Sequence, residues 1–123
     1  MSADPNDIKV ATEGAYVLFL KAKSDSDEDR DEIIAAGGHI QLVKAITMYP
    51  NDAMLCEMVC EALNYITDGS DGPRSAALIA AGAGPVLAAA AQTHSDGAEE
   101  SAERALNNLG LGRDGTPKVH LLA

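Results

Sequence analysis

The chain has 123 residues, of which 19 are acidic and 9 are basic, so its formal net charge at pH 7 is −10. This charge argues against nucleic acid or an anionic membrane as the main partner, because an acidic surface repels both. Hydrophobic residues make up 46% of the sequence, which is too many for a disordered acidic tail. We expect a single domain over residues 1–123, since a chain of this length can bury a core of its own.

Alanine is the commonest residue, and β-branched and aromatic residues are few, which favours helix over strand throughout. Helical spacing of apolar residues, interrupted by glycine, proline and N-cap residues, sets the expected boundaries. Ser26 with Asp29 three residues later resembles a capping box that opens the second helix. The expected helices cover residues 5–22, 26–36, 39–48, 52–67, 73–81, 85–93 and 98–109.

The last residues predict an irregular tail. Glycines and a proline follow Gly110 at short intervals, and neither helix nor strand tolerates them well. Three apolar residues near the end, Val119, Leu121 and Leu122, are candidates to dock on the body of the domain.

The two halves of the chain repeat each other. The run Ile-Ala-Ala-Gly at residues 34–37 returns at residues 79–82, an offset of 45. Ala-Leu-Asn at residues 62–64 returns at residues 105–107, an offset of 43, so we expect the second copy to have a loop two residues shorter. Residues 15–19 match residues 62–66 at an offset of about 47. A period in the forties, with one short and two longer helices, is typical of an α-solenoid.

The repeated order of short helix, glycine break, second helix and longer third helix resembles the armadillo repeat family. The third helix ends in Ala-Leu-Asn-Asn-Leu at residues 105–109, which matches the Ala-Leu-x-Asn-Leu ending of that family, and the likeness covers about residues 32–109. The resemblance implies an all-α, right-handed α-solenoid of about two full three-helix repeats plus a leading helix. Its parts would be a leading helix at 1–23, repeat one at 24–68, repeat two at 69–110 and a tail at 111–123.

In armadillo proteins the third helices line a concave groove, and an asparagine there hydrogen-bonds the main chain of an extended partner. The resemblance gives this role to Asn108, and the equivalent residue in the first repeat is Tyr65. Importin-like members carry a tryptophan four residues before the asparagine, where this chain has Glu61 and Arg104. The resemblance therefore does not imply a receptor for nuclear localisation signals.

Helical geometry leads to a similar candidate surface. If the regularly spaced apolar residues of the helix at 52–67 face the core, the polar residues between them point outward. Tyr65, in such an outward position, is the best single contact candidate. The candidate binding residues are Glu57, Glu61, Asn64, Tyr65, Arg104, Asn107 and Asn108.

This set of residues predicts a non-enzymatic scaffold that binds an extended peptide or partner protein, and a basic segment would suit its carboxylates. Amides pair with main chain, and carboxylates pair with lysine or arginine. The alternative interpretation of the same residues is an ordinary solvated helix face. A different class of function also remains: short solenoids without polar caps expose an apolar end, so the chain could be an assembly module that stacks end to end as a homo-oligomer.

No catalytic residue, cofactor or metal is expected. Residues 25–31 alternate like a calcium loop, but Arg30 stands where a glycine must turn and Ala36 where a bidentate carboxylate is needed. The glycines at 110–115 have dinucleotide-binding spacing without the strand before and the helix after that such a site needs. The histidines lie far apart in the sequence, so no nucleophile is paired with a base.

The two cysteines and the absence of membrane signals bear on location. Cys56 and Cys60 lie one helical turn apart, which is poor disulfide geometry, so we expect buried, reduced thiols. Reduced thiols favour a cytoplasmic location and leave the nucleus open. No secretory signal opens the sequence, and no apolar run approaches the ~20 residues that a membrane span requires.

Overall fold

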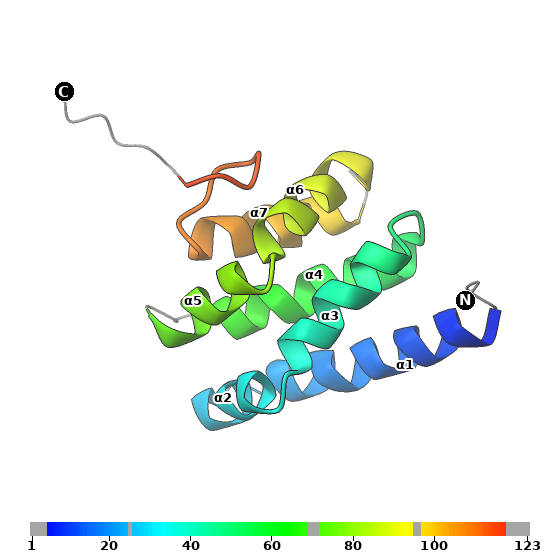
Figure 1. Ribbon diagram of the computed structural model, residues 1–123, viewed down its shortest axis with the longest axis horizontal. Helices are drawn as coiled ribbons and strands as arrows, with labels where there is room; N and C mark the ends of the chain where they lie inside the picture. The colour runs from blue at the N-terminus through cyan, green and yellow to red at the C-terminus, as the bar shows by residue number, and fades with distance from the viewer. Residues whose placement is uncertain (1–4, 25, 69–71, 95–96, 118–123) are drawn as a thin grey trace.

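The computed structural model describes residues 5–24, 26–68, 72–94 and 97–117. Over these residues the protein is all-α, with seven helices, no strand and one isolated β-bridge between Leu111 and Pro117 (Figure 1). The helices are α1 Pro5–Ala22, α2 Asp27–Ala35, α3 Gly38–Met48, α4 Ala53–Thr67, α5 Pro73–Ala80, α6 Ala83–Thr93 and α7 Ala98–Asn108.

Most of the expected helix boundaries are confirmed, and the start of α6 is the largest difference. The sequence places that start at Pro85, whereas the helix begins at Ala83. Gly82, with φ of 90°, adopts the left-handed conformation that separates α5 from α6. Pro85 then falls in the first turn of α6, where a missing N–H removes no helical hydrogen bond. Gly37, with φ of 79°, makes the same break before α3.

Side-chain caps start α2 and α4. The Ser26 hydroxyl accepts a hydrogen bond from the Asp29 N–H at 3.2 Å, as the capping box predicts. The Asp29 carboxylate, however, accepts from the Ser24 hydroxyl at 2.7 Å. The Asp52 carboxylate accepts from the Leu55 N–H at 2.8 Å and thereby fixes the first turn of α4.

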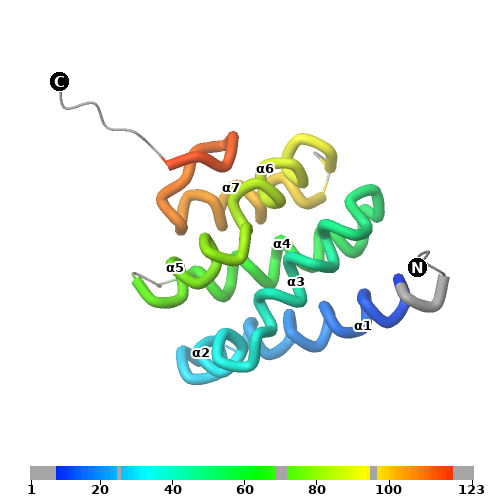
Figure 2. Tube along the Cα trace, viewed as in Figure 1, coloured from blue at the N-terminus to red at the C-terminus, as the bar shows by residue number. Residues whose placement is uncertain are grey.

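Six of the seven described helices form two units with the same order of helices, α2–α4 and α5–α7. α1, α4 and α7 lie side by side, α3 and α6 pack against them on one side, and α2 lies beside α5 (Figures 1 and 2). α3 and α6 both have 11 residues, and both end at a residue of nearly the same conformation, with φ and ψ of −124° and 59° at Tyr49 and −121° and 65° at His94. The units α2–α4 and α5–α7 therefore share local geometry as well as sequence.

The helices α1, α4 and α7 form one row and α3 and α6 form a second row, and the core lies between the two rows. The regularly spaced apolar residues of α4 are fully buried, as the helical spacing predicts, and buried residues of α7 and its C-cap match them at an offset of 43: Leu55, Val59, Ala62, Leu63 and Ile66 against Ala98, Ala102, Ala105, Leu106 and Leu109. Four residues connect α3 to α4, and four residues connect α6 to α7. The prediction that the second copy has a loop two residues shorter is therefore wrong. The offset falls from 45 to 43 because α7 lacks two residues at its start that α4 has.

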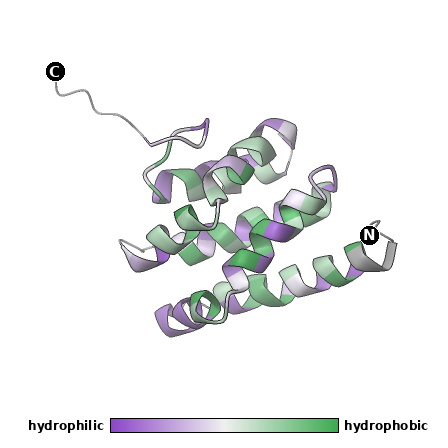
Figure 3. Ribbon diagram, viewed as in Figure 1, coloured by the Kyte–Doolittle hydropathy of each residue, from purple (hydrophilic) through white to green (hydrophobic). Residues whose placement is uncertain are grey.

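The start of α2 is acidic and strongly hydrophilic (Figure 3).

Each unit has one buried arginine, Arg30 in α2 or Arg74 in α5, that connects it to the helix before it. The Arg30 Nε donates to the Ala22 carbonyl at 3.1 Å, and the Arg74 Nε donates to the Ile66 carbonyl at 3.0 Å. In each case the acceptor lies eight residues before the arginine and within the last two residues of a helix. Arg30 and Arg74 recur at an offset of 44, but no local pattern in the sequence predicts that they are buried.

The segment after α7 packs against the α6 and α7 ends of the molecule. Leu111 is buried, and Arg113 pairs with Glu103 at 2.7 Å and with Glu99 at 3.3 Å. A Cβ built on Gly84 would lie 2.8 Å from the Gly115 carbonyl oxygen, so only glycine permits this close approach. The irregular tail is thus a packed turn as far as residue 117, and the proposed docking of residues 119–122 lies outside the described residues.

A search for membrane-spanning helices over the described residues finds no single helix that is long and apolar enough. α5 and α6 together reach the required length and composition, but they are bent by 75° at the break between them.

Candidate functional site

The candidate site is the side of α1, α4 and α7 that faces away from α3 and α6. We call it the three-helix face. On α4 it is formed by residues opposite the buried positions, as helical periodicity predicts. It comprises Tyr16, Phe19 and Lys23 near the end of α1, Glu57, Glu61, Asn64 and Tyr65 on α4, and Arg104, Asn107 and Asn108 on α7.

Three of the four aromatic residues of the chain gather on this face. The Phe19 and Tyr65 rings are 5.9 Å apart between centroids, and Tyr16 lies 6.4 Å from Phe19. The Lys23 ammonium is 5.6 Å from the centre of the Phe19 ring. Tyr65 is half-buried by this contact and not fully exposed. Tyr16 and Phe19 are not among the predicted site residues, because helical periodicity alone does not show which α1 side chains meet Tyr65 of α4.

Two carboxylates lie on α4 before Tyr65: Glu61 one helical turn before it, and Glu57 two turns before it and against Gly97. Glu57 is exposed and Glu61 is half-buried, and neither forms an ion pair with the described lysines and arginines. Burial raises the pKa of Glu61, the negative charge of Glu57 raises it further, and Lys23 acts in the opposite direction. A partly dehydrated carboxylate beside a second negative charge would gain from an added cation.

The asparagines meet each other across the α4–α7 contact. The Asn108 Nδ2 donates to the Asn64 Oδ1 at 3.3 Å and to the Thr67 Oγ1 at 3.1 Å. An amide nitrogen carries two hydrogens, so both donors of Asn108 have acceptors within the protein. The main-chain-binding role that the armadillo resemblance implies for Asn108 would need these bonds to break.

The α7 part of the face is less acidic than the α4 part. Arg104 pairs with Glu100 at 2.9 Å, one helical turn away, and both side chains are exposed. Asn107 is exposed as well. The residues of the three-helix face therefore fall into two groups, an aromatic and acidic group on α1 and α4 and a polar group of balanced charge on α7 and at its contact with α4.

The described residues hold no group of three or more metal-ligating side chains. Asp27 and Asp31, from the run that resembles a calcium loop, bind Arg74 instead. Cys56 and Cys60 are buried and reduced, and burial raises the pKa of Cys60 to about 12. His39 lies in the first turn of α3 and is buried, and this burial lowers its pKa.

The sequence matches no protein-family model, and no curated protein or solved structure is significantly similar to it.

Proposed function

We propose that the protein is a non-enzymatic interaction module that binds an extended basic segment of a partner protein on the three-helix face. In this proposal the helices form an armadillo-like, right-handed solenoid of two three-helix units with α1 as the leading third helix. The shared order of the units and the left-handed glycines at the same place in each support it.

The observation that carries the proposal is Glu61, a half-buried carboxylate with no ion pair to a described lysine or arginine, one helical turn before Tyr65, whose ring packs against Phe19. Glu57 adds a second negative charge one turn further back. An arginine guanidinium can stack on a ring and donate to a carboxylate at the same time. The contact of Lys23 with Phe19 shows that a cation already fits over this surface. An arginine from a partner would form the same kind of cation–ring contact on α4, with Tyr65.

An extended partner suits this face better than a helical one. Packed helices lie about 8–10 Å apart, so equivalent positions on α1, α4 and α7 are separated by that step. An extended chain advances about 3.3 Å per residue, so every third residue would meet a new helix. The proposal therefore favours a segment in which basic residues recur at intervals of three.

The affinity for a synthetic peptide tests the proposed chemistry. The probe is a twelve-residue peptide with arginine at every third position among serine and threonine, compared with its glutamate counterpart. Glu61→Gln should weaken binding of the arginine peptide by about three- to ten-fold, the range for losing one charge-assisted contact. Glu28→Gln removes the same charge from an exposed residue of α2 and should leave the affinity nearly unchanged. Equal binding of the two peptides would contradict the proposal.

End-to-end self-association is the second candidate, and the two ends of the molecule differ in what they offer it. The α7 end is covered by the segment 110–117, whose Leu111 is buried and whose Arg113 is paired with Glu103. Stacking of the α7 end of one copy on the α1 end of another would require this segment to move. Light scattering at high protein concentration tests this candidate, and a strict monomer would remove it.

A further inference from the structure

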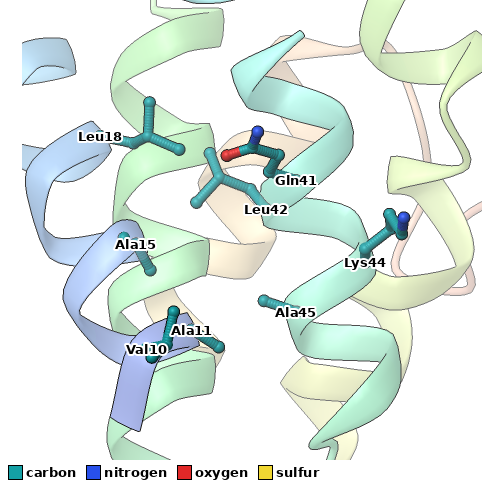
Figure 4. Close-up of a pocket in the computed structure, with 9 residues that line it drawn as sticks. Val10, Ala11, Ala15, Leu18, Gln41, Leu42, Lys44 and Ala45 are labelled. Carbon is teal, nitrogen blue, oxygen red and sulfur yellow. The ribbon is translucent and has the colours of Figure 1, made fainter. Parts of the chain in front are cut away.

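The α1 side of the molecule, unlike the α7 side, is open and apolar. Val10 is 66% exposed and Val17 is 62% exposed, and they lie seven residues apart on one face of α1. Beside Val10 a groove of about 320 Å³ runs between α1 and α3. Its walls are small and apolar, because Ala11 and Ala15 of α1 face Leu42 and Ala45 of α3 (Figure 4).

The internal repeat indicates what shape of partner fits this groove. One unit further along, α3 itself packs against both α4 and α6. α4 follows α1 in the row of third helices, and α6 follows α3 in the second row. The groove between α1 and α3 is therefore the equivalent place without its helix. A helix of about the length of α3, which has 11 residues, would fill it.

The charges around the groove indicate the chemistry of that helix. Lys44 lines the groove and forms no ion pair with a described carboxylate. Of the other described lysines, Lys21 pairs with Glu32, and Lys23 lies on the three-helix face. The groove therefore carries one unpaired positive charge on a chain whose net charge is −10. Two copies joined through this side would bring like charges together, whereas an acidic helix would neutralise them.

We propose that the groove between α1 and α3 is a docking site for an amphipathic helix of a partner protein, apolar on one side and carrying Asp and Glu along its edges. The apolar side would cover Val10, Ala11 and Ala15, and the acidic edge would lie against Lys44. This site is separate from the three-helix face and takes a partner of opposite charge, so its test does not depend on the proposed function.

Gly14 provides a specific way to block the groove. It lines the groove in the middle of α1, and a Cβ added to it would meet no atom within 4 Å. Gly14→Leu should therefore fill the groove without displacing a neighbour, and leucine is a better helix former than glycine. Gly14→Ala is the matched control, because it also favours the helix but adds only a methyl group.

The probe is an 18-residue alanine-rich peptide with leucines at helical spacing and glutamates on both edges, together with a version carrying lysines instead of glutamates. We expect the glutamate peptide to bind and to shift the amide resonances of Ala11, Gly14 and Ala45. Gly14→Leu and Lys44→Glu should each weaken binding at least five-fold, and Gly14→Ala should keep it within about two-fold.

Four results would overturn the proposal: no binding at millimolar peptide, equal binding of the lysine version, unchanged binding by Gly14→Leu, or resonance shifts confined to other helices. A dimer in sedimentation that Gly14→Leu abolishes would instead assign the groove to a second copy of the chain and would also overturn it.

Discussion

Arg74 of α5 lies 2.8 Å from the Asp31 carboxylate of α2 and joins the second three-helix unit to the first. Its other terminal nitrogen is 3.1 Å from Asp27, and its Nε donates to the Ile66 carbonyl at 3.0 Å. The arginine side chain is only 9% exposed, whereas Asp27 and Asp31 are 79% and 66% exposed. Water therefore screens the two ion pairs, and the buried bond to the carbonyl contributes more to stability.

Removal of this arginine should lower the stability of the whole domain. Arg74→Met is expected to reduce the free energy of unfolding by about 1–3 kcal/mol, because it leaves a buried carbonyl without its donor. Asp31→Asn should cost less than about 1 kcal/mol, since its partner keeps two other acceptors. Urea denaturation measures both changes. Arg104→Met, on the surface of α7, is the control, and an equal loss for Arg74→Met and Arg104→Met would contradict the assigned role.

Glu61→Gln should stabilise the protein at neutral pH. Burial and Glu57 raise the pKa of Glu61 in the folded state, so the carboxylate form is less favourable there than in the unfolded chain. Stability from this group is fully present below the pKa of the unfolded chain and is lost as pH rises through the higher pKa of the folded state. Thermal unfolding of the variant should therefore show a gain at pH 7 and almost none at pH 3. A loss of stability at pH 7 would mean that Glu61 has a partner cation within the fold.

Cys56 and Cys60 should be unreactive in the folded protein. Burial raises the pKa of both thiols, that of Cys60 to about 12, so the thiolate is scarce and shielded. A chromogenic disulfide reagent at pH 8 should label neither thiol within the time needed to label both in guanidinium. Rapid labelling of the native protein would show that the α4 core opens readily.

The same substitution should have opposite effects at two glycines. Gly14→Ala on α1 is expected to raise stability by about 0.5–1 kcal/mol through helix propensity, since the added methyl group meets nothing. Gly84→Ala should lower stability by about 1–3 kcal/mol, because the methyl group would lie 2.8 Å from the Gly115 carbonyl. Urea denaturation of the two variants measures the difference. An equal gain at both sites would show that the segment 110–117 does not pack against α6.

Helix existence and burial follow from the sequence because periodicity and caps are local, but the register of α1 does not. The match of residues 15–19 to 62–66 gives an offset of about 47, whereas the arginine bonds make Ala22 equivalent to Ile66 at 44. The two offsets differ by about one helical turn, and a helix presents nearly the same face after three or four residues. The bonds from Arg30 to Ala22 and from Arg74 to Ile66, each across eight residues, favour the offset of 44.

Part of the candidate site follows from local sequence patterns, and part depends on how the helices pack. Outward positions for Glu57 and Glu61 follow from the spacing of buried residues in α4. The contact of Phe19 with Tyr65 and the bond from Asn108 to Thr67 join residues more than 40 positions apart. Such contacts depend on how helices pack, which local patterns do not encode. The packing changes the interpretation of Asn108 most, since its donors are already used.

An NMR titration with the arginine-containing twelve-residue peptide tests the proposed binding face most directly. We expect the amide resonances of Glu57, Glu61 and Tyr65 to move together as peptide is added, and the shifts to shrink when salt is raised from 50 to 300 mM. Residues of α3 and α6, on the opposite side, should stay unchanged. If millimolar peptide moves no resonance of α4, or moves those of α3 and α6 instead, the three-helix face is not a site for a basic segment.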